Sequence, residues 1–400
     1  MISDPSKTMC PVCGSDDVDV FFETRQVPVH CNVLWPSRDE ALQAPRGDLR
    51  LGFCQECGHI FNLAFDPTLM SYAQKYESSL HFSPHFQTYA ESLVAHLVER
   101  YDLHGKKIVE IGCGDGNFLR LLCEAGGNCG VGFDPSFVAD DRGVAGARRV
   151  TVIKDFYSER YVDHHADFIC CRHVLEHIDH PRNLLNSVRR AIGERSDTPV
   201  YFEVPNAQHT LKDSGIWDLI YEHCSYFSAS SLCRLFTSSG FSIRDLTETY
   251  GGQFLGMEAL PEQGVTTLTT VRQPPDGASV ERMARDVTTF AEKYRSKVRC
   301  WGNNLEQMRA AGQQAVIWGT GSKGVTFLNV VVGQDQIRYA VDINPHKQGM
   351  YVPGTGQQIV APKFLQSHEP DVVIVVNPVY EDEIRETVKD LGINPELICV

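Results

Sequence analysis

Residues 107–118 read KIVEIGCGDGNF, a short apolar run followed by three closely spaced glycines and the start of an amphipathic segment. The apolar run predicts a buried strand, and the segment from Asn117 predicts a helix. Glycines at such a junction allow a tight turn and a close approach of the backbone to a ligand, and the helix N-terminus behind them favours a negative group. The stretch therefore predicts a ligand-binding loop at the edge of an α/β sheet.

The same alternation of strands and helices continues on both sides of this loop. Helices are predicted over residues 91–101, 117–126 and 180–192, and strands over 106–112, 128–134, 149–155, 166–174 and 198–205. Strands separated by helices of this length imply a parallel, doubly wound sheet. A further helix and two strands complete the pattern, so the predicted fold class is α/β with a Rossmann-like core.

Changes in composition divide the chain into four predicted parts. Residues 1–70 form a small Cys-rich domain, residues 71–260 the α/β core, residues 261–312 a helical linker of one long helix or two, and residues 313–400 a second, smaller α/β domain. This last domain holds about 90 residues, which is enough for one mononucleotide-binding half of a Rossmann fold.

Composition restricts the class of protein. The 400 residues are 42% hydrophobic and carry a formal net charge of -14. The charge argues against nucleic acid as the main partner, because phosphate backbones require basic surface. We see neither a signal peptide nor an apolar run of about 18 residues, so we expect a cytoplasmic protein with a small-molecule substrate and no membrane contact. The oligomeric state is not indicated.

The glycine loop carries the pattern E-x-G-x-G-x-G at Glu110, Gly112, Gly114 and Gly116. This short loop suits the carboxylate of S-adenosylmethionine better than a pyrophosphate. Asp134 closes the second strand, where it can accept hydrogen bonds from ribose hydroxyls. The remaining expected cofactor contacts are Asp155 and Phe156 for the adenine, together with Asp115, Pro135 and His173. A dinucleotide site is the alternative, but its glycines are spaced G-x-G-x-x-G.

Two cysteine pairs, Cys10-x-x-Cys13 and Cys54-x-x-Cys57, lie in the first domain. Four thiolates in this arrangement suit a tetrahedral, structural zinc ion. A redox role is the alternative for a single C-x-x-C pair.

Acid–base candidates cluster in two segments. His173, Glu176 and His177 follow the fourth strand of the core, where side chains face a bound ligand. The run Tyr221-Glu222-His223 follows the fifth strand, and a histidine beside a carboxylate and a phenol suits general-base chemistry. The alternative is structural, with each histidine hydrogen-bonded in the core and Glu222 and His223 bracing a helix start near Ser228.

The last domain contains G-x-G-x-x-G at Gly319, Gly321 and Gly324, with Asp342 closing the next strand. Taken alone, this pattern suggests NAD. Lys323 within the loop could instead face a substrate diphosphate, and a purely structural role is also open.

Taken together, these features resemble the sugar C-methyltransferases that build branched deoxysugars on nucleotide carriers. The resemblance runs from Cys10 nearly to the C-terminus. The segments that carry it are Tyr76-Glu77-Ser78-Ser79, the glycine loop, His177-Ile178, Glu222-His223, Gly251-Gly252, GTGSKGVTFLN (319–329), VDINPHKQGMYVPGTG (341–356) and PDVVIVVN (370–377).

The resemblance implies a nucleotide-linked (dTDP) 4-keto deoxysugar as acceptor, which is deprotonated beside the ketone and methylated as the enolate. It implies His223 as base with Glu222 orienting it. Tyr221, Tyr76 and His177 would hold the enolate oxygen, and Lys323, Asn329 and Asn377 the nucleotide. Three positions differ from the family: Tyr221 directly abuts Glu222 without an intervening residue, Val376 stands where the family often has Trp, and the loop reads GCGDG where the family often has Asn-Asp-Gly.

Two other functions remain open from the sequence. The same scaffold could methylate oxygen or nitrogen of another metabolite, or the chain could be a non-catalytic module that binds zinc and senses the cofactor.

Overall fold

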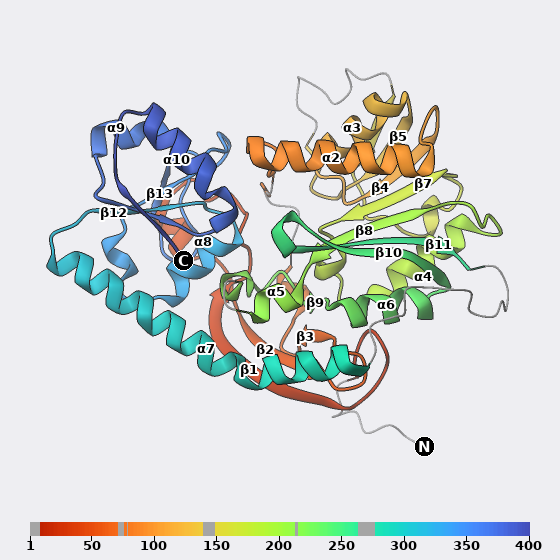
Figure 1. Cartoon of the computed structure of the whole chain (residues 1–400), viewed down its shortest axis with the longest axis horizontal. Helices are drawn as coiled ribbons and strands as arrows, with labels where there is room; N and C mark the ends of the chain where they lie inside the picture. Colours follow the sequence, from red (N-terminus) through yellow and green to blue (C-terminus); the bar gives the residue numbers. More distant parts are fainter. Residues whose placement is uncertain (1–8, 71–75, 78, 139–148, 213–214, 263–276) are drawn as a thin grey trace.

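The structure, a computed structural model, describes residues 9–70, 76–77, 79–138, 149–212, 215–262 and 277–400. Ser78 and residues 263–276 of the predicted linker lie outside these described residues. Three sheets organise the described part of the chain: a central sheet, an N-terminal sheet below it and a C-terminal sheet beside it in the view of Figure 1.

The central sheet has seven strands. In spatial order they are β10 (Phe241–Thr249), β11 (Phe254–Pro261), β8 (Val200–Pro205), β7 (Phe168–Arg172), β4 (Lys107–Ile111), β5 (Cys129–Phe133) and β6 (Val150–Ile153). The five strands from β8 to β6 are parallel, whereas β11 is antiparallel to both of its neighbours. The strand order reverses between β4 and β7, and ligands of open α/β sheets bind at this switch point. The predicted α/β, Rossmann-like fold class is confirmed.

Helices cover both faces of the central sheet (Figure 1). Helices α2 (Pro84–Tyr101) and α3 (Asn117–Gly126) lie on one face, and α4 (Pro181–Ile192) and α6 (Ala229–Ser238) lie on the other; the short α5 (Ala207–Leu211) follows β8. In α2 the buried residues Leu93, Val94, Leu97 and Val98 recur at helical spacing, so one apolar stripe packs against the sheet.

The N-terminal sheet is antiparallel and includes a strand from the core. Its strands are β1 (Val18–Pro28), β2 (Arg46–Cys54), β3 (Ile60–Asn62) and β9 (Ser225–Tyr226), and the short α1 (Arg38–Leu42) precedes β2. In the register of β3 with β9, Ile60 faces Tyr226. The core segment that follows residues 221–223 is therefore hydrogen-bonded into the N-terminal sheet.

The C-terminal sheet has five parallel strands. These are β14 (Gln358–Val360), β13 (Tyr339–Val341), β12 (Ala315–Trp318), β15 (Val372–Val375) and β16 (Glu396–Cys399), with helices α8 (Ser322–Val330), α9 (Leu365–His368) and α10 (Glu381–Asp390).

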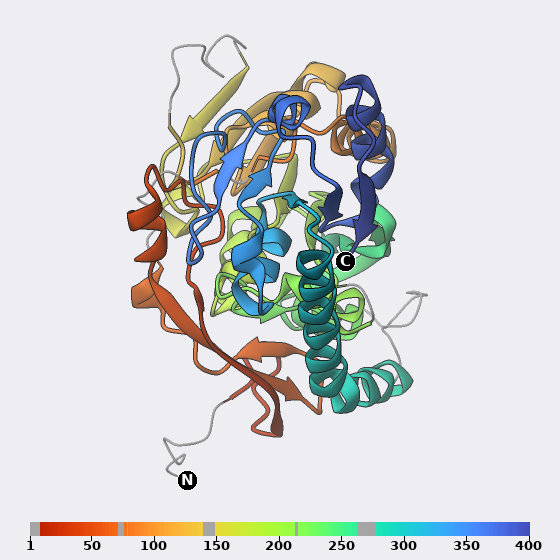
Figure 2. The ribbon, with the colours of Figure 1, turned by 90° about the vertical axis from the view of Figure 1, so that its left-hand side faces the viewer.

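A single long helix, α7 (Gly277–Ala310), runs from the N-terminal sheet to the C-terminal sheet (Figures 1 and 2). At one end the Phe290 ring lies 5.4 Å from that of Phe22 in β1, and at the other the Trp301 ring lies 5.2 Å from that of Phe327 in α8. One continuous apolar cluster thus joins the N-terminal sheet, α7 and the C-terminal sheet.

Among the helices of the described ranges, none combines the length and the apolar composition needed to cross a membrane.

Candidate active site

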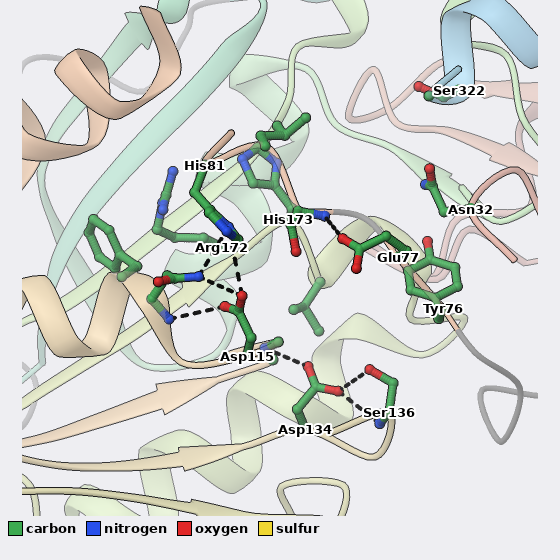
Figure 3. Close-up of a pocket in the computed structure, with 18 of the residues that line it drawn as sticks. Asn32, Tyr76, Glu77, His81, Asp115, Asp134, Ser136, Arg172, His173 and Ser322 are labelled. Carbon is green, nitrogen blue, oxygen red and sulfur yellow. Dashed lines mark hydrogen bonds and ion pairs between the residues drawn. The ribbon is translucent and has the colours of Figure 1, made fainter. Parts of the chain in front are cut away.

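A cavity of about 2340 Å³ lies where the three sheets face one another. It is bordered by the carboxyl ends of β4, β5, β6 and β7, by the segment before α2, and by the loop between β12 and α8. Figure 3 shows Asp115 and Asp134 on the side of the central sheet, and Ser322 on the side of the C-terminal sheet. A ligand in this cavity would contact the core and the C-terminal domain together.

The glycine loop lies at the floor of the cavity, at the end of β4. Gly112 has φ +71°, and a Cβ added to it would lie 2.0 Å from a methyl carbon of Val174. Gly114 has φ +56°, but an added Cβ there would meet no atom within 4 Å. Gly112 is thus required by the packing of the protein, whereas Gly114 leaves open space beside the backbone for a ligand. Gly116 does not line the cavity and is the N-cap of α3.

Asp134 braces the glycine loop from the end of β5. One carboxylate oxygen accepts the backbone N–H of Gly114 at 2.8 Å, and the other accepts the N–H and hydroxyl of Ser136 at 2.8 and 2.6 Å (Figure 3). Since Ser136 was not predicted, its hydroxyl is an addition to the expected site. The only signal for it in the sequence is its position two residues after Asp134.

The other residues expected to bind the cofactor also border the cavity. Glu110 is buried, and burial raises its pKa to about 8. Asp155 accepts hydrogen bonds from the Tyr161 hydroxyl and the Arg160 guanidinium, each at 2.6 Å, while Phe156 leaves 57% of its surface exposed at the cavity wall. The lining also includes Asp115, Pro135 and His173.

His173 is held by a buried network that the sequence did not predict. Arg172 donates to Glu203 at 3.0 and 2.8 Å, and His173 Nε2 lies 2.9 Å from the same carboxylate oxygen. Burial alone would raise the pKa of Glu203, but Arg172 and His173 lower it overall. His173 adopts a left-handed conformation with φ +55°, which is uncommon for a residue other than glycine. The ionised Glu203 therefore fixes a strained residue at the cavity wall.

The run Tyr221-Glu222-His223 is split by a turn. His223 lines the cavity, but Tyr221 and Glu222 do not. The Tyr221 ring lies against Gly47, and its hydroxyl accepts the N–H of Asp66 at 2.8 Å. Ile220 lines the cavity instead. The expectation that Tyr221 contacts the acceptor is not supported by this geometry.

The Glu222 carboxylate also points toward the N-terminal sheet. It accepts the N–H of Cys31 at 2.9 Å and lies 3.4 Å from the ring of His30. Burial would raise the pKa of Glu222, but His30 and His177 lower it overall, so the buried side chain is an ionised carboxylate. The side chain anchors the turn and leaves His223 to other partners.

His223 and His177 lie together at the cavity, with ring centroids 5.0 Å apart. His177 Nδ1 lies 3.0 Å from the backbone oxygen of Glu222, and because a carbonyl only accepts, Nδ1 carries the proton and Nε2 is the basic nitrogen of the neutral ring. Burial lowers the pKa of His177 and lowers that of His223 well below its usual range. Both imidazoles are therefore neutral and able to accept a proton.

The segment before α2 connects the N-terminal and C-terminal domains at the cavity. Tyr76 lines the cavity and pairs with Val33 in an isolated bridge. The next residue, Glu77, accepts the Asn344 amide at 3.1 Å and donates its N–H to the Asn32 oxygen at 2.8 Å. Nothing in the sequence links Asn32 to Asn344, so this part of the site could not be foreseen.

Two of the three residues expected to bind the nucleotide face the cavity. Lys323 Nζ lies 2.8 Å from Asp218 and 3.2 Å from the amide oxygen of Gln253, and Asn377 exchanges hydrogen bonds with the same Gln253. Asn329 instead donates within α8 and to the Pro353 oxygen and does not line the cavity. Asn329 is thus a structural residue in this arrangement.

The four predicted cysteine ligands come together at the turns of the N-terminal domain. The sulfurs of Cys10 and Cys57 lie 3.7 Å apart, and those of Cys13 and Cys54 lie 3.5 Å apart. All four sulfurs are within 4.8 Å of one another.

Comparisons with known proteins agree with this arrangement. Residues 85–246 match a family described as a methyltransferase domain, and residues 251–394 match a family described as a C-methyltransferase C-terminal domain. The chain is 27% identical to C-methyltransferase NovU of Streptomyces niveus, over 95% of this chain and 92% of that protein. A ubiquinone biosynthesis O-methyltransferase of Actinobacillus pleuropneumoniae is 31% identical, over only 28% of this chain and 49% of that protein.

Two solved methyltransferase structures each overlap with 44% of the chain. A 1,6-didemethyltoxoflavin-N1-methyltransferase of Burkholderia thailandensis with bound S-adenosylhomocysteine is 16% identical with a TM-score of 0.34, over 44% of this chain and 79% of that one. The magnesium protoporphyrin IX methyltransferase of Synechocystis is 19% identical with a TM-score of 0.33, over 44% of this chain and 84% of that one.

The two family matches occupy consecutive parts of the chain, and the match to NovU spans nearly all of both proteins. The protein is an S-adenosylmethionine-dependent methyltransferase that is similar to a C-methyltransferase over nearly its whole length.

Proposed function

We propose that this enzyme methylates the carbon beside the ketone of a nucleotide-linked (dTDP) 4-keto deoxysugar. The observation that carries the proposal is the position of the neutral His223–His177 pair. It borders the same cavity as the glycine loop on one side and the Lys323 loop of the C-terminal domain on the other. A cavity of this size accommodates a methyl donor and a nucleotide-linked acceptor together.

The residues at the central sheet fit the methyl donor. The open space beside Gly114 would receive the amino-acid end, Asp134 the ribose, and Asp155 with Phe156 the adenine. The exposed Phe156 ring supports this assignment, because an exposed aromatic face suits stacking on a base. When bound, S-adenosylmethionine supplies an electrophilic methyl group.

The cysteine cluster fits a structural zinc ion. Tetrahedral coordination with a Zn–S distance of about 2.3 Å places ligand sulfurs about 3.8 Å apart. The distances of 3.7 and 3.5 Å between paired sulfurs are close to this value. Four cysteines complete the coordination shell, so we assign the ion a structural role.

The proposed reaction begins with proton removal by His223. The ketone acidifies the neighbouring C–H bond, and the neutral His223 ring accepts the proton, leaving the electron pair as an enolate. Tyr76 would donate a hydrogen bond to the enolate oxygen, in place of the Tyr221 hydroxyl that the turn directs away. His177, with its basic Nε2, would accept a hydrogen bond from a sugar hydroxyl.

The nucleotide would lie along the C-terminal domain. Lys323 can exchange its contact with Asp218 for a diphosphate oxygen, since both partners are anionic and the ammonium is partly exposed. Asn377 and Gln253 would contact the nucleoside. Val376 also lines this region, where the family often has Trp, so we expect a wider nucleoside subsite.

The test is a mass-shift screen of dTDP-linked keto sugars with labelled S-adenosylmethionine, combined with solvent deuterium exchange. With S-adenosylhomocysteine in place of the donor, the enolate route predicts rapid exchange at the carbon beside the ketone. A methylated product without such exchange would assign the enzyme to O- or N-methylation, the alternative raised by the partial likeness to an O-methyltransferase.

A further inference from the structure

A buried acid, Glu176, lies beside the proposed base and has no role in the reaction described above. It belongs to the single helical turn Leu175–His177 that directly follows β7, and it is 1% exposed. Three atoms lie within 4.8 Å of one another: one carboxyl oxygen of Glu176, one ring nitrogen of His177 and one ring nitrogen of His223. The Oε2 atom of Glu176 is buried, with no hydrogen-bond partner among the described residues.

The backbone fixes this acid and the base relative to each other. The Cys224 thiol lies 3.5 Å from the backbone oxygen of Glu176, and His177 contacts the backbone oxygen of Glu222. The turn that holds Glu176 is therefore attached to the residues on both sides of His223. Glu222, the carboxylate next to His223 in sequence, is committed to His30 and Cys31 instead.

We propose that Glu176 accepts the proton that His223 removes from the acceptor, which returns His223 to its neutral form inside the cavity. This inference rests on the proposed proton removal by His223. The acceptor C–H bond breaks as an N–H bond forms on His223. The electron pair left on carbon forms the new C–C bond to the methyl group as the bond from that methyl to the donor sulfur breaks, and the electron pair of the broken bond stays on sulfur. The N–H bond then breaks as an O–H bond forms on Glu176, which releases the proton to solvent before the next turnover. Side-chain rotation or one water molecule spans the remaining distance.

Burial acts in opposite directions on the two groups. It raises the pKa of Glu176 to about 8 and lowers the pKa of His223 well below its usual range. The carboxylate is therefore the stronger base of the pair, and the proton moves from His223 to Glu176. Other ionisable groups face Glu176 or share its surroundings: His173 and His177 on its own segment, Glu203 from β8, Cys171 from β7, and His223 and Cys224 from the turn before β9.

The proposed proton transfer depends on pH in a defined way. Glu176 can accept a proton only as the carboxylate, and below its raised pKa it already carries one. Turnover should therefore increase as the pH rises through about 8 and level off above it. The proposed base has its pKa far below this range, so it does not titrate there.

The experiment compares the pH dependence of kcat in wild type and three variants, with a dTDP-linked 4-keto-6-deoxyhexose as the probe. We expect Glu176→Gln to lower kcat by about 10²-fold and to remove the increase near pH 8. Glu176→Asp should recover most of the wild-type kcat and most of the increase near pH 8. Glu258→Gln is the matched control, because Glu258 is also a buried carboxylate of the central domain but contacts His96, Arg100 and Tyr101 away from the cavity. Its profile should keep the wild-type shape.

The outcomes separate this inference from the proposed function. A wild-type enzyme that neither exchanges nor methylates the probe contradicts the proposed function and the proton transfer with it. A wild-type profile that is flat from pH 6 to pH 9, or a Glu176→Gln profile that keeps the wild-type shape, overturns the role of Glu176 alone. If Glu176→Gln does not fold, the wild-type and Glu176→Asp profiles decide. A second metal ion per chain, lost in Glu176→Asp, would also overturn it by making Glu176, His177 and His223 metal ligands.

Discussion

Three glycines with similar backbone angles allow the cofactor loop to be tested by three single substitutions. Gly105, Gly112 and Gly114 have φ of +66°, +71° and +56°. A methyl group added at Gly105 or Gly114 meets no protein atom within 4 Å, whereas at Gly112 it lies 2.0 Å from a Val174 methyl carbon. Gly105 lies away from the cavity, and Gly114 borders it. A comparison of the three alanine substitutions therefore separates the effects of backbone strain, of packing and of ligand contact.

The expected magnitudes follow from these surroundings. Gly105→Ala should lower the free energy of unfolding by about 1–2 kcal/mol, the cost of a left-handed conformation for a residue with a Cβ. Gly114→Ala should cost about the same in the unbound protein. Gly112→Ala should cost about 1–3 kcal/mol more, because Val174 and its neighbours must move. Gly114→Ala should weaken the binding of S-adenosylhomocysteine by about tenfold or more, equivalent to about 1.4 kcal/mol. It should be the only one of the three substitutions that does so without the larger loss of stability.

The assays are denaturant unfolding for stability and titration calorimetry for affinity, with Gly105→Ala as the reference. Wild-type affinity in Gly114→Ala would mean that no ligand approaches this backbone, and the assignment of the loop to the methyl donor would fail. Equal stability of Gly112→Ala and Gly105→Ala would refute the packing argument, because it would mean that Val174 moves aside without cost.

Three further substitutions test other parts of the site. His223→Asn should abolish methylation while keeping affinity for S-adenosylhomocysteine, and unchanged turnover would remove it as the base. Lys323→Met should raise KM for the nucleotide sugar about tenfold with little change in kcat, whereas the exposed Lys363→Met should not; equal KM values would exclude a diphosphate contact. Metal analysis should find about one zinc per wild-type chain and none in Cys54→Ala, which should also lose turnover; a metal-free, active wild type would contradict the structural zinc.

The central fold could be predicted because its helices and strands are each indicated by a short, continuous stretch of sequence. The predicted helix over 117–126 coincides with α3, and the predicted strand over 106–112 differs from β4 by one residue at each end. Parallel strands alternating with helices leave few possible sheet orders. The pairing of β3 with β9 could not be predicted, because Ile60 and Tyr226 are far apart in sequence and β9 has only two residues.

The sequence motifs identified residues that border the cavity, but they did not show in which direction every side chain points. The glycine loop, Asp134 and His223 border the cavity because strand ends and loop positions determine where they lie. Tyr221 and Glu222 are at the tip of a turn, so their side chains point away from that of the neighbouring His223. Sequence adjacency suggested one catalytic group of three residues, but a turn separates neighbours in space.

The N-terminal domain positions the proposed base although it contributes none of the acid–base groups. Glu222 and Tyr221 are bound by Cys31 and Asp66 on one side of His223, and on the other side β9 pairs with β3.

Helix α6, which follows β9, is attached to the second cysteine pair, since Ser230 donates to the Cys57 oxygen at 3.1 Å and Ser228 donates to the Gly58 oxygen at 3.0 Å. Loss of the proposed zinc ion would loosen these anchors while leaving the glycine loop on β4 intact. Zinc removal should therefore lower kcat more than it lowers affinity for the methyl donor, which is why turnover and binding must be measured together in Cys54→Ala.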